Sequence, residues 1–186
     1  MSIAAAWAAD KEAAPFKAAP AASYVHHQTI SQVTIAVDPY MAGDKVKTAF
    51  GKLDPYEYGI LPVLVVMQND SGQTIRLDRM KATYVGPGGD RVEATPAKDV
   101  RYTRGPSRPS AVGGPVGKVL NRKKNPLDAW EIEGRAFAAQ MLPPGNSTSG
   151  FLYFQSGLQH GATLYLTGLS EAGSGKELFY FEVPLE

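Results

Sequence analysis

Two glutamates in the C-terminal half have the residue type and spacing that acid–base catalysis needs. Glu131 and Glu133 are separated by one residue. If residues 129–133 form a strand, both carboxylates lie on one face about 7 Å apart, which suits an acid and a base at a glycosidic bond. Trp130 and Ile132 would then be the buried side chains. Because any solvated strand face yields such pairs, a small hydrolase acting on envelope polysaccharide is only the alternative function.

Motifs for phosphate binding are incomplete in this chain. A phosphate loop requires a glycine five residues before its Gly-Lys pair and a serine or threonine after the lysine. Around Gly175 and Lys176 these positions hold Ser170 and Glu177. The segment also joins two predicted strands and opens no helix that could hold a phosphate at its N-terminus. A hairpin turn is the better interpretation.

Histidine and cysteine supply no metal or thiol chemistry. His26 and His27 are adjacent and would point to opposite faces of an extended chain, so they are poorly placed to share a metal. His160 stands beside Gly161 at an expected strand end. The absence of cysteine excludes disulfides, thiol catalysis and cysteine zinc sites. We therefore expect no cofactor, no metal and no catalytic residue, and predict that the protein is not an enzyme.

The segment from Arg101 to Lys124 is the most informative charge feature. It holds seven basic residues and no acidic one, whereas the rest of the chain holds twelve basic and eighteen acidic residues. This charge favours an anionic ligand, either nucleic acid, a phospholipid headgroup or an acidic cell-envelope polymer. The alternative is a solvated loop without a binding role, whose positive charge the acidic C-terminal strands partly neutralise. The candidate ligand-binding residues are Arg101, Arg104, Arg108, Lys118, Arg122, Lys123 and Lys124.

Composition indicates an ordinary globular protein. Of the 186 residues, 44% are hydrophobic and 20% are charged, which excludes a disordered chain. The net charge of +1 gives no indication that the molecule as a whole binds a polyanion. The longest apolar runs, such as Ile60 to Met67, are far shorter than the ~20 residues that span a bilayer. We predict no membrane span.

From residue 28 onward the apolar residues mostly recur with the period of two that strands have. Residues 33–37 and 75–77 alternate, and residues 60–67 are apolar on both faces, as in a covered central strand. Turn residues separate these runs, for example Asn69-Asp-Ser-Gly72. A short helical turn is also expected, with Asp44 as its cap, Val46, Ala49 and Phe50 on one face, and Gly51 at its end.

The strand phases predict a core. Each predicted core residue occupies the apolar phase of an alternating or fully apolar strand. They are Val65, Ile75, Leu77, Phe151, Tyr153, Leu164, Leu166, Phe179 and Phe181.

Two segments depart from the strand pattern. Residues 1–22 contain eleven alanines and few large apolar side chains, so residues 1–24 are interpreted as a flexible leader or tether. Ala6-Trp7-Ala8 has the small-x-small form of a signal-peptidase site, which favours an exported protein. Residues 101–127 carry eight glycines and prolines, and they are interpreted as a long loop excursion inside a single domain spanning residues 25–186.

Two stretches resemble immunoglobulin-like sandwich domains of uncharacterised exported or lipoprotein-type bacterial proteins. One runs from Ile60 through the Asn69–Gly72 turn to Asp78, and the other is Leu142-Pro-Pro-Gly145 followed by Gly150-Phe-Leu-Tyr-Phe154. The resemblance implies a fold and an extracytoplasmic setting, and it carries no catalytic residue across. The chain lacks both the lipid-bearing cysteine of lipoproteins and the Cys…Trp…Cys signature of antibody domains.

The sequence thus predicts an all-β protein, an immunoglobulin-like antiparallel sandwich of seven to nine strands with at most one or two short helices. A small barrel or two separate sheets are the alternative architectures. The predicted function is a non-enzymatic binding or structural module in the periplasm or cell envelope. Its partner would be a protein or an envelope component, with polyanion binding by residues 101–124 as a further alternative.

Overall fold

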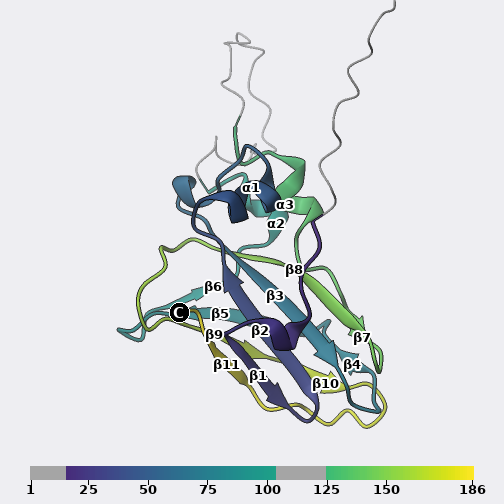
Figure 1. The fold of residues 1–186 in the computed structure, drawn as a ribbon. Coiled ribbons are helices and arrows are strands. Elements are labelled where there is room, and N and C mark those ends of the chain that lie inside the picture. Colours follow the sequence, from purple (N-terminus) through teal and green to yellow (C-terminus); the bar gives the residue numbers. More distant parts are fainter. Residues whose placement is uncertain (1–15, 104–124) are drawn as a thin grey trace, which may run out of the picture.

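The computed structural model describes residues 16–103 and 125–186 (Figure 1). Strands dominate this part of the chain, which confirms the all-β class. It holds eleven strands where seven to nine were expected, and five short helical segments where one or two were expected. The helical segments are η1 (Ala21–Ser23), α1 (Asp44–Phe50), η2 (Tyr56–Tyr58), α2 (Ala97–Val100) and α3 (Trp130–Gly134).

The strands form three antiparallel sheets. Two sheets have four strands each, in the orders β1-β2-β3-β8 and β11-β9-β5-β6, and the third joins three very short strands in the order β10-β4-β7. The strands are β1 (His27–Ile30), β2 (Val33–Pro39), β3 (Leu61–Asn69), β4 (Ile75–Arg76), β5 (Lys81–Val85), β6 (Arg91–Glu93), β7 (Met141–Leu142), β8 (Ser147–Phe154), β9 (Thr163–Thr167), β10 (Ser170–Glu171) and β11 (Phe181–Pro184).

Strand β3 is the covered central strand that its sequence predicts. Its alternate side chains enter two different hydrophobic clusters, so seven of its nine residues in succession are buried. Proline cannot donate to a ladder, and Pro62 accordingly stands second in the strand, near its start. The carbonyl oxygen of Pro62 accepts a hydrogen bond from the Tyr40 amide at 2.9 Å.

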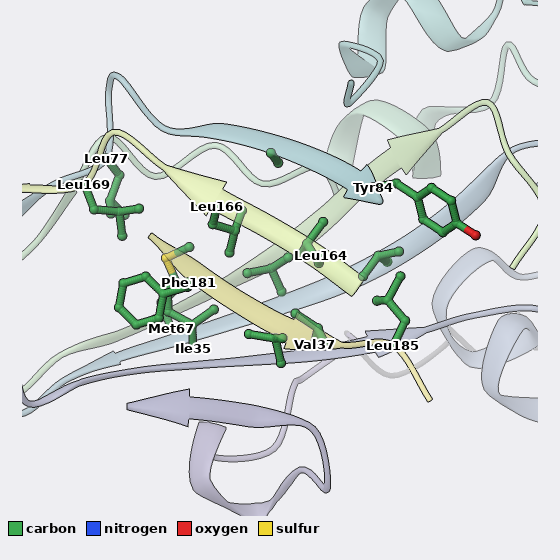
Figure 2. Close-up of a cluster of buried hydrophobic side chains, with 14 of the residues drawn as sticks. Ile35, Val37, Met67, Leu77, Tyr84, Leu164, Leu166, Leu169, Phe181 and Leu185 are labelled. Carbon is green, nitrogen blue, oxygen red and sulfur yellow. The ribbon is translucent and has the colours of Figure 1, made fainter. Parts of the chain in front are cut away.

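The first cluster lies between the two four-stranded sheets. Figure 2 shows Ile35 and Met67 from one sheet gathered with Leu166 and Phe181 from the other. All four side chains are fully buried. Because both sheets bury one face in this cluster, apolar burial holds them together.

The second cluster covers the opposite face of the β1-β2-β3-β8 sheet. It joins β3 and β8 side chains to Val46, Ala49 and Phe50 of α1. The helix ends at Gly51 with φ +64° as predicted, but its N-cap is Gly43 and not Asp44, which is its first residue. Helices α1, α2 and α3 gather at one end of the molecule (Figure 1), called the helical end below.

Residues 16–24, assigned to the leader, lie against the folded body. Phe16 packs on Tyr40 and Phe151, with ring centroids 6.3 and 5.4 Å apart. Ala21 is fully buried in the second cluster, and Tyr24 lies at its margin. Residues 16–24 therefore contact the folded body, although they belong to the segment that the sequence assigned to the leader. Residues 1–15 lie outside the described residues, as do residues 104–124 of the excursion.

Phe179 does not belong to the core, whereas the other eight predicted core residues are buried. Its side chain is 77% exposed. The backbone around it is irregular, because Leu178 is held by an amide hydrogen bond to the Leu169 carbonyl and β11 begins only at Phe181. Leu178 and Phe181 both point inward, so the three-residue step between them leaves the intervening side chains in solvent.

Asn69 fixes the predicted turn after β3. The side chain is fully buried, and its Nδ2 donates to the carbonyl oxygens of Gln73 and Leu142, each at 2.8 Å. Its Oδ1 accepts from the amide and hydroxyl of Ser71. One amide group thereby ties the turn to the third sheet, because Leu142 belongs to β7.

Candidate functional site

The ends of the basic excursion meet at the helical end. Asn125 Nδ2 donates to the Arg101 carbonyl oxygen. The Arg101 guanidinium pairs with Asp128 at 2.8 Å and also with Glu133 of α3. Of the seven predicted ligand-binding residues, only Arg101 lies in the described residues, and its charge is matched there by two carboxylates. The other six, Arg104, Arg108, Lys118, Arg122, Lys123 and Lys124, lie outside the described residues.

The predicted carboxylate pair is not formed, because residues 130–134 are helical and not extended. On a helix, residues two apart do not face each other. Glu133 pairs with Arg101, while Glu131 lies near Gly51, where an added Cβ would be 3.7 Å from Glu131 Oε1. Ile132 is buried as predicted, but Trp130 is 68% exposed. The geometric argument for a hydrolase is therefore wrong.

Two glycines place the segment that follows α3. At Gly134 an added Cβ would meet the Trp130 ring at 3.0 Å, so the ring folds back over this glycine. At Gly150 of β8 an added Cβ would lie 2.6 Å from the Phe137 backbone nitrogen. The chain at residues 135–137 can therefore run directly over β8, where the Phe151 amide donates to the Arg135 carbonyl at 2.8 Å.

These contacts put Arg135 in the wall of a cavity of about 290 Å³. The guanidinium carbon lies over the Phe16 ring at 5.4 Å and over the Trp130 ring at 5.7 Å. Both distances suit cation–π attraction. The cavity is lined by Phe16, Trp130, Gly134, Arg135, Ala136, Ser149 and Gly150.

Arg135 has unused hydrogen-bonding capacity. Its Nε is buried and has no hydrogen-bond partner among the described residues. No described carboxylate forms an ion pair with its guanidinium, although Arg76 has one such partner and Arg101 has two. Native proteins rarely leave a buried donor without a partner. A guanidinium is always charged and presents a planar fork of donors, which matches the two oxygens of a carboxylate or phosphate.

Tyr153 of β8 holds α3 in place. Its hydroxyl donates to the Ile132 carbonyl oxygen at 2.8 Å. Burial raises the pKa of Tyr153, and the positive charge of Arg135 opposes part of that rise. The hydroxyl therefore stays protonated at neutral pH and remains a donor. A buried hydrogen bond thus holds α3, and with it the chain leading to Arg135, on β8.

His27 and His160 each bond to a different partner, and no histidine lines the cavity. His27 Nδ1 bonds to the Tyr24 carbonyl oxygen, and His160 pairs with Glu186 at 3.0 Å. Over residues 16–103 and 125–186, no group of three histidine or carboxylate side chains is arranged to hold a metal ion. Within the same ranges, no helix is both long enough and apolar enough to cross a membrane.

Sequence reasoning did not single out Arg135. One feature of the sequence could have pointed to Arg135. Residues 128–186 contain seven acidic residues and only two basic ones, Arg135 and Lys176. An isolated cation flanked by Trp130 and Gly134 is a weak pattern, and only the fold brings Phe16 and Gly150 to it. No protein-family model matches the chain, and no curated protein matches it in sequence.

Proposed function

We propose that the protein is a non-enzymatic binding module whose cavity at Arg135 accepts an oxyanion group, a carboxylate or a phosphate, of its partner. The observation that carries the proposal is Arg135 in the cavity wall, whose guanidinium has no carboxylate partner and whose buried Nε has no hydrogen-bond partner among the described residues. An oxyanion in the cavity would pair with the positive charge of this guanidinium and accept hydrogen bonds from it. Binding would also gain from the flanking rings, since they restrict the guanidinium before the ligand arrives.

The proposed architecture is an immunoglobulin-like β-sandwich, and the proposed location is outside the cytoplasm. Support for the architecture comes from the cluster that both four-stranded antiparallel sheets share. Support for the location comes from the alanine-rich start and its Ala6-Trp7-Ala8 sequence. Fractionating bacterial cells that express the full reading frame tests the location. Recovery in the cytoplasmic fraction alone would contradict it.

The oxyanion proposal is tested by NMR on protein with ¹⁵N-labelled arginine. The Nε–Hε signal of Arg135 is followed while sodium acetate or sodium phosphate replaces sodium chloride at constant ionic strength. We expect a saturable shift at Arg135 and at the Trp130 indole, and a much smaller shift at Arg76, whose guanidinium is already paired with Asp78 at 2.7 Å.

The variant Arg135→Met separates binding from packing, because methionine keeps an unbranched apolar stem but removes the charge. We expect it to abolish the shift of the Trp130 indole while circular dichroism and the urea midpoint stay close to those of the parent. If the Arg135 signal moves no more than that of Arg76 with both salts, Arg135 serves only to hold Phe16 and Trp130 in place, and the proposal is wrong.

A further inference from the structure

A second surface, on the sheet that contains β9 and β11, exposes aromatic side chains to solvent. Phe179 is 77% exposed and Tyr180 is 51% exposed, directly before β11. The Tyr180 ring stacks on Tyr165 of β9, with centroids 5.1 Å apart and planes at 31°. Tyr180 and Tyr165 are called the aromatic patch below, and Phe179 is the exposed aromatic residue that precedes the patch in the sequence. Exposed apolar side chains that lie together commonly mark an interaction site.

The aromatic patch is held in position from both sides. Leu164 and Leu166 are fully buried, so Tyr165 between them points to the outer face of the sheet. The Arg91 guanidinium lies over the Tyr165 ring at 5.8 Å. Tyr165 in turn supports the Tyr180 ring. A ligand would therefore meet rings whose orientation is set in advance, which lowers the entropy cost of binding.

The register places hydrogen-bonding groups beside the rings. Glu182 of β11 and Thr83 of β5 stand opposite Tyr165 on its two sides, and Thr83 stands opposite Glu93 of β6. These groups therefore form one row across the outer face, with neighbours about 5 Å apart. A hollow of about 250 Å³ adjoins the row and includes Thr83 and Glu93 in its lining.

The charges on this face favour a neutral ligand. Lys81 and Arg91 are balanced by Glu93 and Glu182, and all four side chains are exposed. A polyanion would be repelled by the two carboxylates that flank Tyr165 and Thr83. Nucleic acid and acidic polymers are therefore poorly matched to this face, in contrast to the cavity at Arg135.

The size of the aromatic patch argues against a protein partner. A fully buried aromatic side chain accounts for roughly 150–250 Å², so at the observed exposures the patch, even with Phe179 added, presents at most about 400 Å². A stable protein interface buries roughly 800 Å² on each side. A sugar ring fits the patch better. One face of a pyranose carries C–H groups that favour the negative face of an aromatic ring, and its hydroxyls can reach the threonine and the carboxylates.

We infer that the outer face of the β11-β9-β5-β6 sheet is a binding surface for a neutral oligosaccharide, with Tyr180 stacking on a sugar ring. Tyr165 acts as a positioning residue, and Glu182, Thr83 and Glu93 supply hydrogen bonds. The inference is independent of the oxyanion proposal, because it uses no residue of the cavity at Arg135.

The test is an NMR titration of the full chain with two neutral probes, a β-1,4-linked glucose hexasaccharide and a β-1,4-linked N-acetylglucosamine hexasaccharide. We expect at least one probe to shift the signals of Phe179, Tyr180 and Thr83. Tyr180→Ala should weaken its binding about tenfold, the effect of losing one aromatic contact. Tyr165→Phe should preserve binding because it keeps the supporting ring, whereas Tyr165→Thr should weaken it.

The matched control is Tyr102→Ala, which removes a partly exposed tyrosine at the helical end and should leave saccharide binding unchanged. Three outcomes would overturn the inference. One is the absence of shifts with both probes at millimolar concentration, and another is equal binding by the parent and Tyr180→Ala. The third is stronger binding of a thymidine octanucleotide than of either sugar, which would assign the surface to nucleic acid.

Discussion

Phe179 and Phe181 form an internal matched pair, since they have the same side chain, are two residues apart and differ fully in burial. Phe181 is 0% exposed in the first cluster, and Phe179 is 77% exposed. Burying roughly 150–250 Å² of aromatic surface at about 25 cal/mol per Å² contributes ~4–6 kcal/mol as an upper estimate. Phe181→Ala keeps part of this surface but leaves a cavity, so we expect a loss of ~3–5 kcal/mol.

Phe179→Ala should cost less than ~0.5 kcal/mol, as is usual for a surface position. The assay is urea unfolding followed by circular dichroism, with the slope m compared between variants to confirm that the same unfolding is measured. For a chain of this size the Phe181 variant should melt roughly 6–20 °C lower. Equal losses of stability in the two variants would refute the strand phase and the irregular step after Leu178.

Three other expectations concern stability. Asn69→Ala should cost ~2–4 kcal/mol in urea unfolding, because the Leu142 carbonyl and the Ser71 amide lose buried partners; a loss below ~1 kcal/mol would mean that water replaces the side chain. Gln32→Gly should raise stability by ~0.5–1 kcal/mol, because Gln32 has φ +63° in the β1–β2 turn; an unchanged or lower urea midpoint would contradict this. Burial and the Asp38 carboxylate raise the pKa of Tyr40, so stability should be full below about pH 10 and fall above it, as tyrosines of the unfolded chain ionise first. Tyr40→Phe should lose less stability between pH 8 and pH 11 than the parent, and an equal loss would show that Tyr40 is not the group responsible.

Local sequence patterns were enough to predict those elements whose conformation depends mainly on residues nearby in the chain. The alternation of Ile75 and Leu77 set the buried face in that region, and Asn69 supplied the hydrogen bonds of its own turn. Gly51 could be placed at the end of a helix because few other residues adopt a positive φ at low cost. The run of apolar residues from 60 to 67 indicated a strand that is covered on both faces.

Tertiary contacts decided the features on which both proposed sites depend. Residues 129–133 alternate like a strand, but residues 130–134 form a helix from which Ile132 packs into the second cluster. The helix then separates Glu131 from Glu133. Arg135 gains its environment from Phe16 and Gly150, which are far from it in the sequence.

The phase of the last strand was also decided by tertiary contacts. Periodicity assumes an unbroken strand, and it placed Phe179 and Phe181 on the same buried face. The hydrogen bond from Leu178 to Leu169 breaks that strand, and the short strand that follows begins at Phe181. A period of two is a property of continuous backbone pairing, and pairing depends on where a distant segment lies. The sequence by itself therefore determined the class of the fold and the turn after β3, while the tertiary structure decided which side chains reach solvent to meet a ligand.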